Sequence, residues 1–138
     1  QVLSAEAYSK HGFNIHGAWT GIRLEHIRAI ANADEGISAH DDVQMEVEDA
    51  EIAWNGSVSG GVADVDRCIT RYRNCTVHDN LAAAFFMAGK SHVVTDTLIY
   101  HQARDFVIRK ETMCQRERID WRNADLSQRS PNTKEGFE

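Results

Sequence analysis

The stretch Gly36-Ile37-Ser38-Ala39-His40-Asp41-Asp42 has a counterpart in Gly61-Val62-Ala63-Asp64-Val65-Asp66-Arg67, which begins 25 positions later. Both open with glycine and a branched apolar residue, and both carry acidic residues near their end. The residues that follow stay aligned without a gap, so that Asn55 falls on Asn80. Self-similarity at a fixed period of 20 to 50 residues is the signature of a repeat architecture. The alignment therefore predicts stacked structural units.

The repeat extends in both directions from these two rows. A third row occupies residues 84–102, a fourth occupies residues 105–121, and a poorer row ends at Asn32. Asparagine recurs at the row ends as Asn32, Asn55 and Asn80, and asparagine is typical of turns. We therefore expect about five coils, each of roughly two dozen residues.

The side-chain pattern within the rows indicates strands. Residues 44–47 and 69–72 tend to alternate in side-chain type with a period of two, and β-branched and aromatic residues are frequent. Helical solenoid units are longer, at about 33 residues or more, and the Leu-x-x-Leu-x-Leu signature of leucine-rich repeats is absent. The pattern predicts an all-β, right-handed parallel β-helix over residues 12–122. We expect a short helix or cap within residues 1–11 and a polar, irregular tail over residues 123–138.

The proposed register predicts which residues lie beside each other in neighbouring coils. Glu46 is expected over Arg71, and Glu48 over Arg73, because equivalent residues of parallel strands lie roughly 4.8 Å apart. Opposite charges in such positions stabilise a register. Two apolar columns are expected inside: Ile37, Val62, Phe85 and Phe106 in one, and Ile52, Val77, Ile99 and Ile119 in the other. Asn55 and Asn80 are expected to stack as a ladder of side-chain amides.

Composition excludes several classes of partner. The 138 residues are 42% hydrophobic and 26% charged, with a formal net charge of -6, so the chain has no basic surface for nucleic acid. The longest apolar run, residues 81–88, is too short to span a membrane. The three cysteines match no paired zinc motif and are expected to be small buried residues.

The rows 36–42 and 61–67, with their Gly-apolar opening, β-branched middle and terminal asparagine, resemble repeats of the pectate-lyase-like parallel β-helix superfamily. The resemblance covers residues 12–122 and concerns the repeat pattern alone. That superfamily contains polysaccharide lyases, pectin-type hydrolases and uronate epimerases, together with non-catalytic adhesins and phage tail domains. By this analogy, the resemblance implies a polysaccharide or oligosaccharide partner.

One corner of the predicted solenoid gathers acidic residues. If the register holds, His40, Asp41, Asp42, Asp64 and Asp66 converge there. Such a group could bind Ca²⁺ through Asp41, Asp64 and Asp66, or could supply a general acid and base for glycosidic chemistry. The same residue types are also typical of plain turns, where they hydrogen-bond the nearby backbone.

A second group of candidates lies elsewhere in the repeat. Arg71 is a candidate base or carboxylate clamp, and Arg73 and His92 are candidate binding residues. The alternative is that both arginines form solvated ion pairs with glutamates and that His92 is a satisfied structural histidine. Trp54 is the tryptophan best placed to stack on a sugar ring, if it is exposed.

Two functions follow from these candidates. The first is a non-catalytic β-helix domain that binds polysaccharide or acts as a structural module. The second is a lyase, uronate epimerase or glycoside hydrolase with Asp64, Asp66, His40 and Arg71 as catalytic residues. A polysaccharide partner favours an extracellular or cell-surface location. Five coils are few for an isolated β-helix, so we expect self-association or a longer parent chain.

Overall fold

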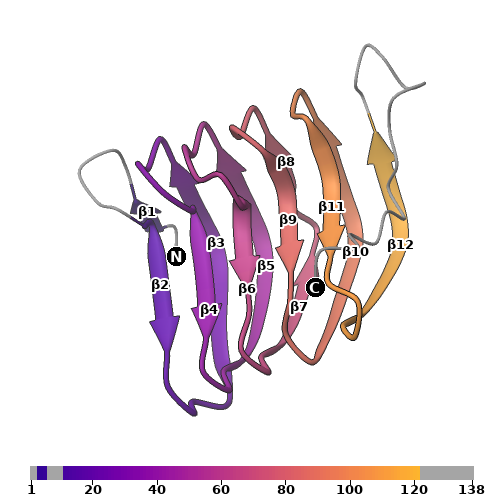
Figure 1. Ribbon diagram of the computed structural model, residues 1–138. Helices are drawn as coiled ribbons and strands as arrows, with labels where there is room; N and C mark the ends of the chain where they lie inside the picture. The colour runs from indigo at the N-terminus through magenta and orange to yellow at the C-terminus, as the bar shows by residue number, and fades with distance from the viewer. Residues whose placement is uncertain (1–2, 6–10, 122–138) are drawn as a thin grey trace.

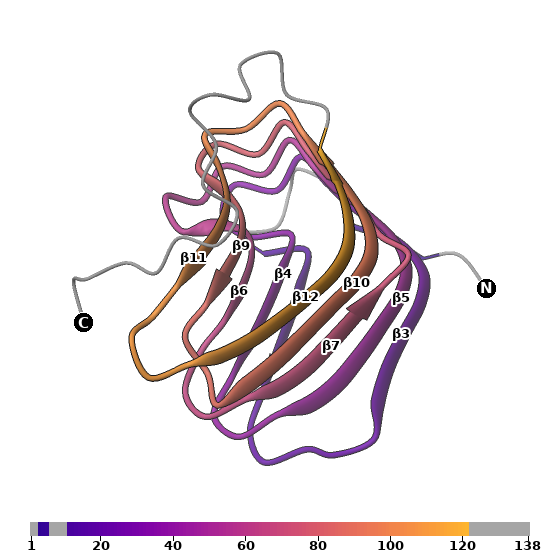
Figure 2. The same ribbon diagram turned by 90° about the vertical axis from the view of Figure 1, so that its right-hand side faces the viewer.

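The chain forms a parallel β-solenoid of about five turns, seen from the side in Figure 1 and from one end in Figure 2. The computed structural model describes residues 3–5 and 11–121, and within these residues every regular element is a strand. The strands are β1 (Leu3–Ala5), β2 (Phe13–His16), β3 (Ile22–Ile30), β4 (Ile37–His40), β5 (Gln44–Ala53), β6 (Gly60–Asp64), β7 (Ile69–Arg73), β8 (Thr76–His78), β9 (Ala83–Met87), β10 (Ser91–Tyr100), β11 (Arg104–Ile108) and β12 (Met113–Trp121).

Each coil passes through two parallel sheets. The short sheet contains the strands β2, β4, β6, β9 and β11, and the long sheet contains β1, β3, β5, β7, β8, β10 and β12. The predicted register is confirmed, because Glu46 lies opposite Arg71 and Glu48 lies opposite Arg73 in the pairing of β5 with β7. No helix in the described part of the chain is long and apolar enough to cross a membrane.

The first predicted apolar column is confirmed. Its members Ile37, Val62, Phe85 and Phe106 are neighbours in successive strands, and each is 0% exposed. The rings of Phe85 and Phe106 stack with centroids 5.2 Å apart. Burying side chains of this size stabilises the fold by about 1.5–3 kcal/mol each.

The second column holds for three of its four predicted members. Ile52, Val77 and Ile99 are aligned and buried, but Ile99 lies opposite Trp121 rather than Ile119. The prediction for Ile119 was wrong because the last coil keeps the 22-residue length of the coil before it. Ile119 consequently lies opposite Thr97.

The predicted asparagine ladder is confirmed and explains why the rows 36–42 and 61–67 open with glycine. The side-chain amide of Asn55 donates to Oδ1 of Asn80 at 3.0 Å, and that of Asn80 donates to Gln102 at 2.9 Å. A Cβ atom on Gly61 would lie 2.7 Å from the Asn80 side chain, and one on Gly36 would lie 2.7 Å from Nδ2 of Asn55. Glycine is therefore required at these two positions, where the row passes close to an asparagine side chain.

The coils turn at residues with left-handed backbone conformation. One corner column has φ values of 53–56° and a second has values of 53–60°. Most members are aspartate, asparagine or histidine, the non-glycine types that adopt this conformation most readily. The first corner column is His26, Asp49, Asn74, Asp96 and Arg118, and the second is Ala31, Trp54, Asp79 and His101.

The predicted ends are only partly described. Ala5, which we expected at the start of a helix or cap, belongs to strand β1 and pairs with Ala29 of β3. Residues 6–10 and the predicted tail over residues 123–138 lie outside the described residues. The three cysteines are free thiols; Cys68 and Cys75 are buried as expected, while Cys114 is half-buried.

Candidate functional site

Three of the predicted corner residues meet at an exposed corner of the solenoid. Ligand atoms of His40, Asp41 and Asp66 all lie within 4.8 Å of one another. Nδ1 of His40 is 2.8 Å from Oδ2 of Asp41, and its Nε2 is 3.2 Å from Oδ1 of Asn14. The ring also stacks on His16, one coil earlier, at 5.1 Å between centroids. His40 is therefore held in place by contacts on both nitrogens and on one face.

Asp42, the fourth residue predicted for this corner that lies there, forms an ion pair with an arginine. Asp42 accepts two hydrogen bonds of 2.9 Å from Arg67 in the next coil, and this pairing lowers the pKa of Asp42. Asp41, Asp42 and Arg67 all have positive φ. The left-handed backbone of these residues therefore forms the turns that follow β4 and β6.

Asp64 does not join this corner. It is 0% exposed and lies inside the solenoid, where its Oδ2 accepts a 2.8 Å hydrogen bond from the Tyr72 hydroxyl. Burial raises the pKa of Asp64 to about 7, while the neighbouring Thr70 and Tyr72 hydroxyls oppose the rise. The expectation that Asp64 lines an exposed acidic site was therefore wrong in its placement.

The calcium set predicted from the sequence does not fit the observed corner. Asp41 and Asp66 are together, but the third ligand, Asp64, faces the core. Ca²⁺ takes six to eight oxygen ligands, and the described corner offers two carboxylates and a histidine nitrogen. These residues are a poor match for a calcium site.

His92 is an interior residue that completes a polar network. It is 1% exposed; its Nδ1 lies 2.7 Å from the Thr70 hydroxyl, and its Nε2 accepts the amide hydrogen of Gly89 at 3.1 Å. Burial lowers the pKa of His92 to about 4. The neutral ring thus satisfies buried groups, and its placement matches the structural alternative.

The two predicted arginines on β7 differ in their partners. Arg73 donates to Glu48, as expected from the register. Arg71 lies opposite Glu46, but Glu46 instead accepts a 2.7 Å hydrogen bond from Arg23. Within residues 11–121, Arg71 is the one arginine whose side chain has no hydrogen bond, ion pair or ring contact. The expected Glu46–Arg71 ion pair was therefore wrong.

Arg71 borders a groove of about 470 Å³ on the outer face of the long sheet. Ile69 and Val93 give the groove an apolar part, and Gln44 and Ser91 contribute polar groups. An exposed guanidinium beside hydroxyl and amide groups can bind a carboxylate through paired hydrogen bonds.

Trp54 is exposed at the corner that follows β5. The side chain is 59% exposed, and its φ of 60° turns it outward from the asparagine ladder. The ring meets His78 edge-on at 6.1 Å between centroids, and His78 in turn stacks on Tyr100 at 4.6 Å. Trp54 therefore stands on a packed layer of rings.

Carboxylates hold His78 beneath the tryptophan. Nε2 of His78 is 3.0 Å from Oε2 of Glu51, and its Nδ1 is 2.7 Å from Oδ2 of Asp79. The hydrogen bond with His78 lowers the pKa of Glu51, and Arg28 adds to this effect against the cost of burial. Nδ1 of the exposed His101 is 3.6 Å from Oδ1 of Asp79. A network of polar side chains consequently reaches the exposed Trp54 through His78.

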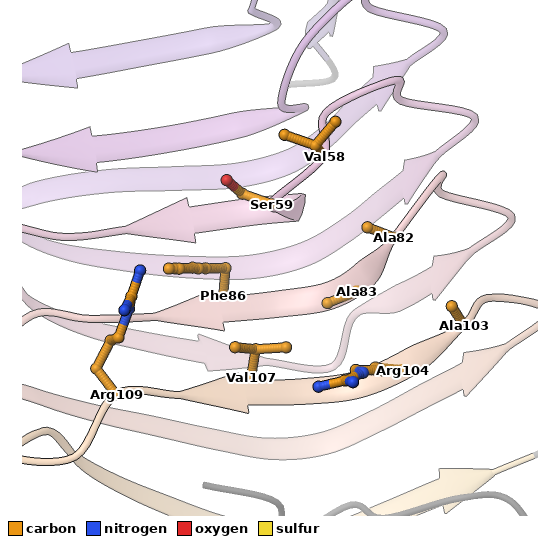
Figure 3. A pocket seen from close by; sticks show the side chains of 9 residues that line it. All are labelled: Val58, Ser59, Ala82, Ala83, Phe86, Ala103, Arg104, Val107 and Arg109. Carbon is orange, nitrogen blue, oxygen red and sulfur yellow. The ribbon is translucent and has the colours of Figure 1, made fainter. Parts of the chain in front are cut away.

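A second groove, of about 460 Å³, lies on the outer face of the short sheet (Figure 3). Phe86 and Val107 form its floor, and Arg104 and Arg109 stand at its two ends. This groove is not predictable from the sequence, because outward-facing apolar residues of β9 and β11 look like core residues in a short apolar run. The cluster of His78, Asp79 and Tyr100 was not predicted either, because His78 meets Tyr100 only through the stacking of coils.

Comparison of the chain with protein-family models, curated proteins and solved structures finds no match of any of the three kinds.

Proposed function

We propose that the chain is a pectate-lyase-like β-helix domain that binds a polysaccharide at the corner of Trp54, outside the cell or at its surface. The observation that carries this proposal is the exposure of Trp54 on a layer of ordered rings. Sugars present an apolar face and many hydroxyl groups, so their sites combine an aromatic surface with fixed hydrogen-bonding groups. Asp79 and His101 supply such groups in the network that reaches Trp54 through His78.

Preorganisation supports the proposal as well. Glu51, Asp79 and Tyr100 fix His78, and His78 supports the edge of Trp54. A ligand that stacks on a ring already fixed in place loses less binding energy to ordering of the side chain.

The test compares two exposed tryptophans. A glycan array identifies a bound oligosaccharide, and calorimetry then measures its affinity for the wild type, Trp54→Ala and Trp19→Ala. Trp19 is 63% exposed and makes no side-chain ring contact within the described residues, so it controls for loss of an exposed indole. We expect Trp54→Ala to weaken binding about tenfold or more, and Trp19→Ala to leave it unchanged. Equal effects of the two substitutions, or no bound glycan, would contradict the proposal.

A polysaccharide lyase, uronate epimerase or glycoside hydrolase is the second candidate, favoured by the exposed and unpartnered Arg71. The other residues predicted for catalysis do not gather around it: Asp64 is inside the core, while His40 and Asp66 share a corner. Ultraviolet absorbance during incubation with uronate polymers detects lyase product. Absorbance that rises with the wild type and stays flat with Arg71→Lys supports this candidate, and no rise with the wild type removes the lyase.

A further inference from the structure

Arg71 is an unpartnered cation beside the groove on the outer face of the long sheet. No described residue accepts a hydrogen bond from its side chain or forms an ion pair with it. Its neighbour in the preceding coil, Glu46, bonds Arg23 instead, and Arg73, two positions along β7, bonds Glu48. Both neighbouring arginines are therefore paired with glutamates, whereas the Arg71 guanidinium is available to an external anion.

The groove has an apolar floor on the side of Arg71 that faces away from Glu46. Ile69 lies two positions before Arg71 on the same strand, and Val93 lies opposite Arg71 in the next coil. These side chains project from the same face of the sheet, and Ser91, opposite Ile69, adds a hydroxyl group. Arg71 is the one charged residue that β7 and β10 contribute to the lining of the groove. One cation therefore stands beside an apolar surface.

We propose that this groove binds a small carboxylate with a flat, apolar body. The carboxylate would accept paired hydrogen bonds from the Arg71 guanidinium, and the body would pack on Ile69 and Val93. Neighbouring strands lie about 4.8 Å apart, and two residues of one strand span about 7 Å, so a body of one or two fused rings can contact both apolar side chains. The groove volume of about 470 Å³ lies within the range of small-molecule sites.

This site differs from both candidate functions described above. It shares no residue with the saccharide site at Trp54. The ligand also differs from the uronate of a lyase or epimerase, because an apolar body on Ile69 and Val93 supplies part of its affinity, where a uronate presents a hydroxylated ring.

The test is an NMR titration of the full, isotope-labelled chain with two matched ligands. 2-Naphthoate carries the carboxylate, and 2-naphthamide is its neutral counterpart. We expect the acid to bind about tenfold more tightly than the amide, because the paired, charged hydrogen bonds to Arg71 supply the difference. The amide signals of residues 69–71 and 91–93 should shift on binding. Equal affinities, no binding, or shifts confined to other residues would overturn the proposal.

Two variants separate the charge from the apolar floor. Arg71→Gln removes the guanidinium and should bring the affinities of acid and amide to within about twofold of each other. Val93→Thr replaces a methyl group by a hydroxyl at a half-buried outward position, so it should weaken the binding of both ligands and leave their ratio at about tenfold. An unchanged preference in Arg71→Gln, or unchanged affinities in Val93→Thr, would contradict the assignment.

Two further variants control for general charge and for the site at Trp54. Arg118→Gln removes an exposed arginine that is paired with Asp96, and it changes the formal charge by the same amount as Arg71→Gln. The affinity for naphthoate should stay unchanged in Arg118→Gln and in Trp54→Ala. A loss in either control equal to the loss in Arg71→Gln would overturn the proposal.

A second carboxylate tests the selectivity for an apolar body. D-Galacturonate carries its charge on a hydroxylated ring, and it should bind at least about tenfold more weakly than 2-naphthoate, because it gains little from the apolar floor. Equal or tighter binding of D-galacturonate at residues 69–71 would overturn the proposal and favour the second candidate function.

Discussion

The two sides of strand β7 illustrate how the solenoid separates structure from binding. Thr70 and Tyr72 point inward and join a buried polar network, while Arg71 and Arg73 point outward to solvent. The inner residues have fixed, buried partners. The outer residues compete for partners along the face, and Arg71 is left without one among the described residues. Side chains that point inward from a coil thus stabilise the fold, whereas side chains that point outward can contact ligands.

Removing a ring from the inner side should have the largest effect. Phe85→Ala empties a position that is 0% exposed and contacts both Phe106 and Tyr72. We expect the free energy of unfolding to fall by about 3–5 kcal/mol, measured by denaturant titration. The matched outer variant is Phe86→Ala, at a half-buried neighbour. If both variants lose the same stability, the distinction between the two sides fails at this position.

The buried carboxyl should make stability depend on pH. Folding raises the pKa of Asp64 from 3.8 to about 7, so the folded state favours the protonated form. The stability from this group is complete below about pH 4 and is lost as the pH rises through 7. Asp64→Asn should remove this loss, so that the variant gains on the order of 3 kcal/mol relative to wild type between pH 4 and pH 8.

The readout for Asp64 is the difference in unfolding free energy between variant and wild type at each pH. The wild type alone is a poor measure, because His92 acts in the opposite sense. Its pKa falls from 6.5 to about 4, so its contribution is lost as the pH drops through this range. Asp66→Asn, two residues away at the exposed corner, controls for loss of one formal charge. A constant difference for Asp64→Asn across this pH range would contradict the assignment.

Loss of the inner asparagine ladder and loss of the outer Asn74–Asp49 contact should differ by a smaller amount. Asn55→Ala leaves buried donors of Asn32 and the buried carbonyl of Ala29 without their partner, and should cost about 1–3 kcal/mol. Asn74 bonds Asp49 on the outer side, and Asn74→Gly removes this contact while keeping the positive φ. Thermal unfolding of both variants compares the inner ladder with the outer contact. A greater loss for Asn74→Gly than for Asn55→Ala would reverse the expected order.

The smallest effect is expected for the exposed ion pair of Glu48 and Arg73. A double-mutant cycle with Glu48→Gln and Arg73→Gln should give a coupling free energy of at most about 1 kcal/mol, since water and salt screen the pair. The coupling should shrink as salt is added. The cycle of Glu46→Gln with Arg71→Gln should give less, because Arg23 holds Glu46. A larger coupling for that second pair would show that Arg71 is not free.

The fold was predictable from the sequence because its repeat is long-range but regular. Aligning Gly36 with Gly61 is sufficient to place Val62 over Ile37 and Asn80 over Asn55. The prediction failed for Ile119, because it followed similarity of residue type rather than the 22-residue spacing that relates β10 to β12. Because the coils stack regularly, one correct alignment of two rows predicts the neighbours of many residues. An error in one row affects only the residues of that row.

The candidate site was less predictable because side-chain partners depend on competition in three dimensions. The alignment placed Arg71 beside Glu46, but the Glu46 carboxylate accepts its hydrogen bond from Arg23 of the preceding coil. Asp64 looked like a turn residue, yet its partner Tyr72, eight positions later, draws it into the core. The corner of His40, Asp41 and Asp66 was predictable, because adjacent turns bring those side chains together whatever their partners.

Stacking of coils in this register is the claim on which all the placements depend. Through-hydrogen-bond scalar couplings measured by NMR test it directly, since they report which amide is bonded to which carbonyl. The structure predicts a coupling between the amide nitrogen of Gly36 and the carbonyl of Gly61, where the two atoms are 2.8 Å apart, and another between Ile69 and Val43 at 2.9 Å. Couplings shifted by one residue, or none between coils, would contradict the account.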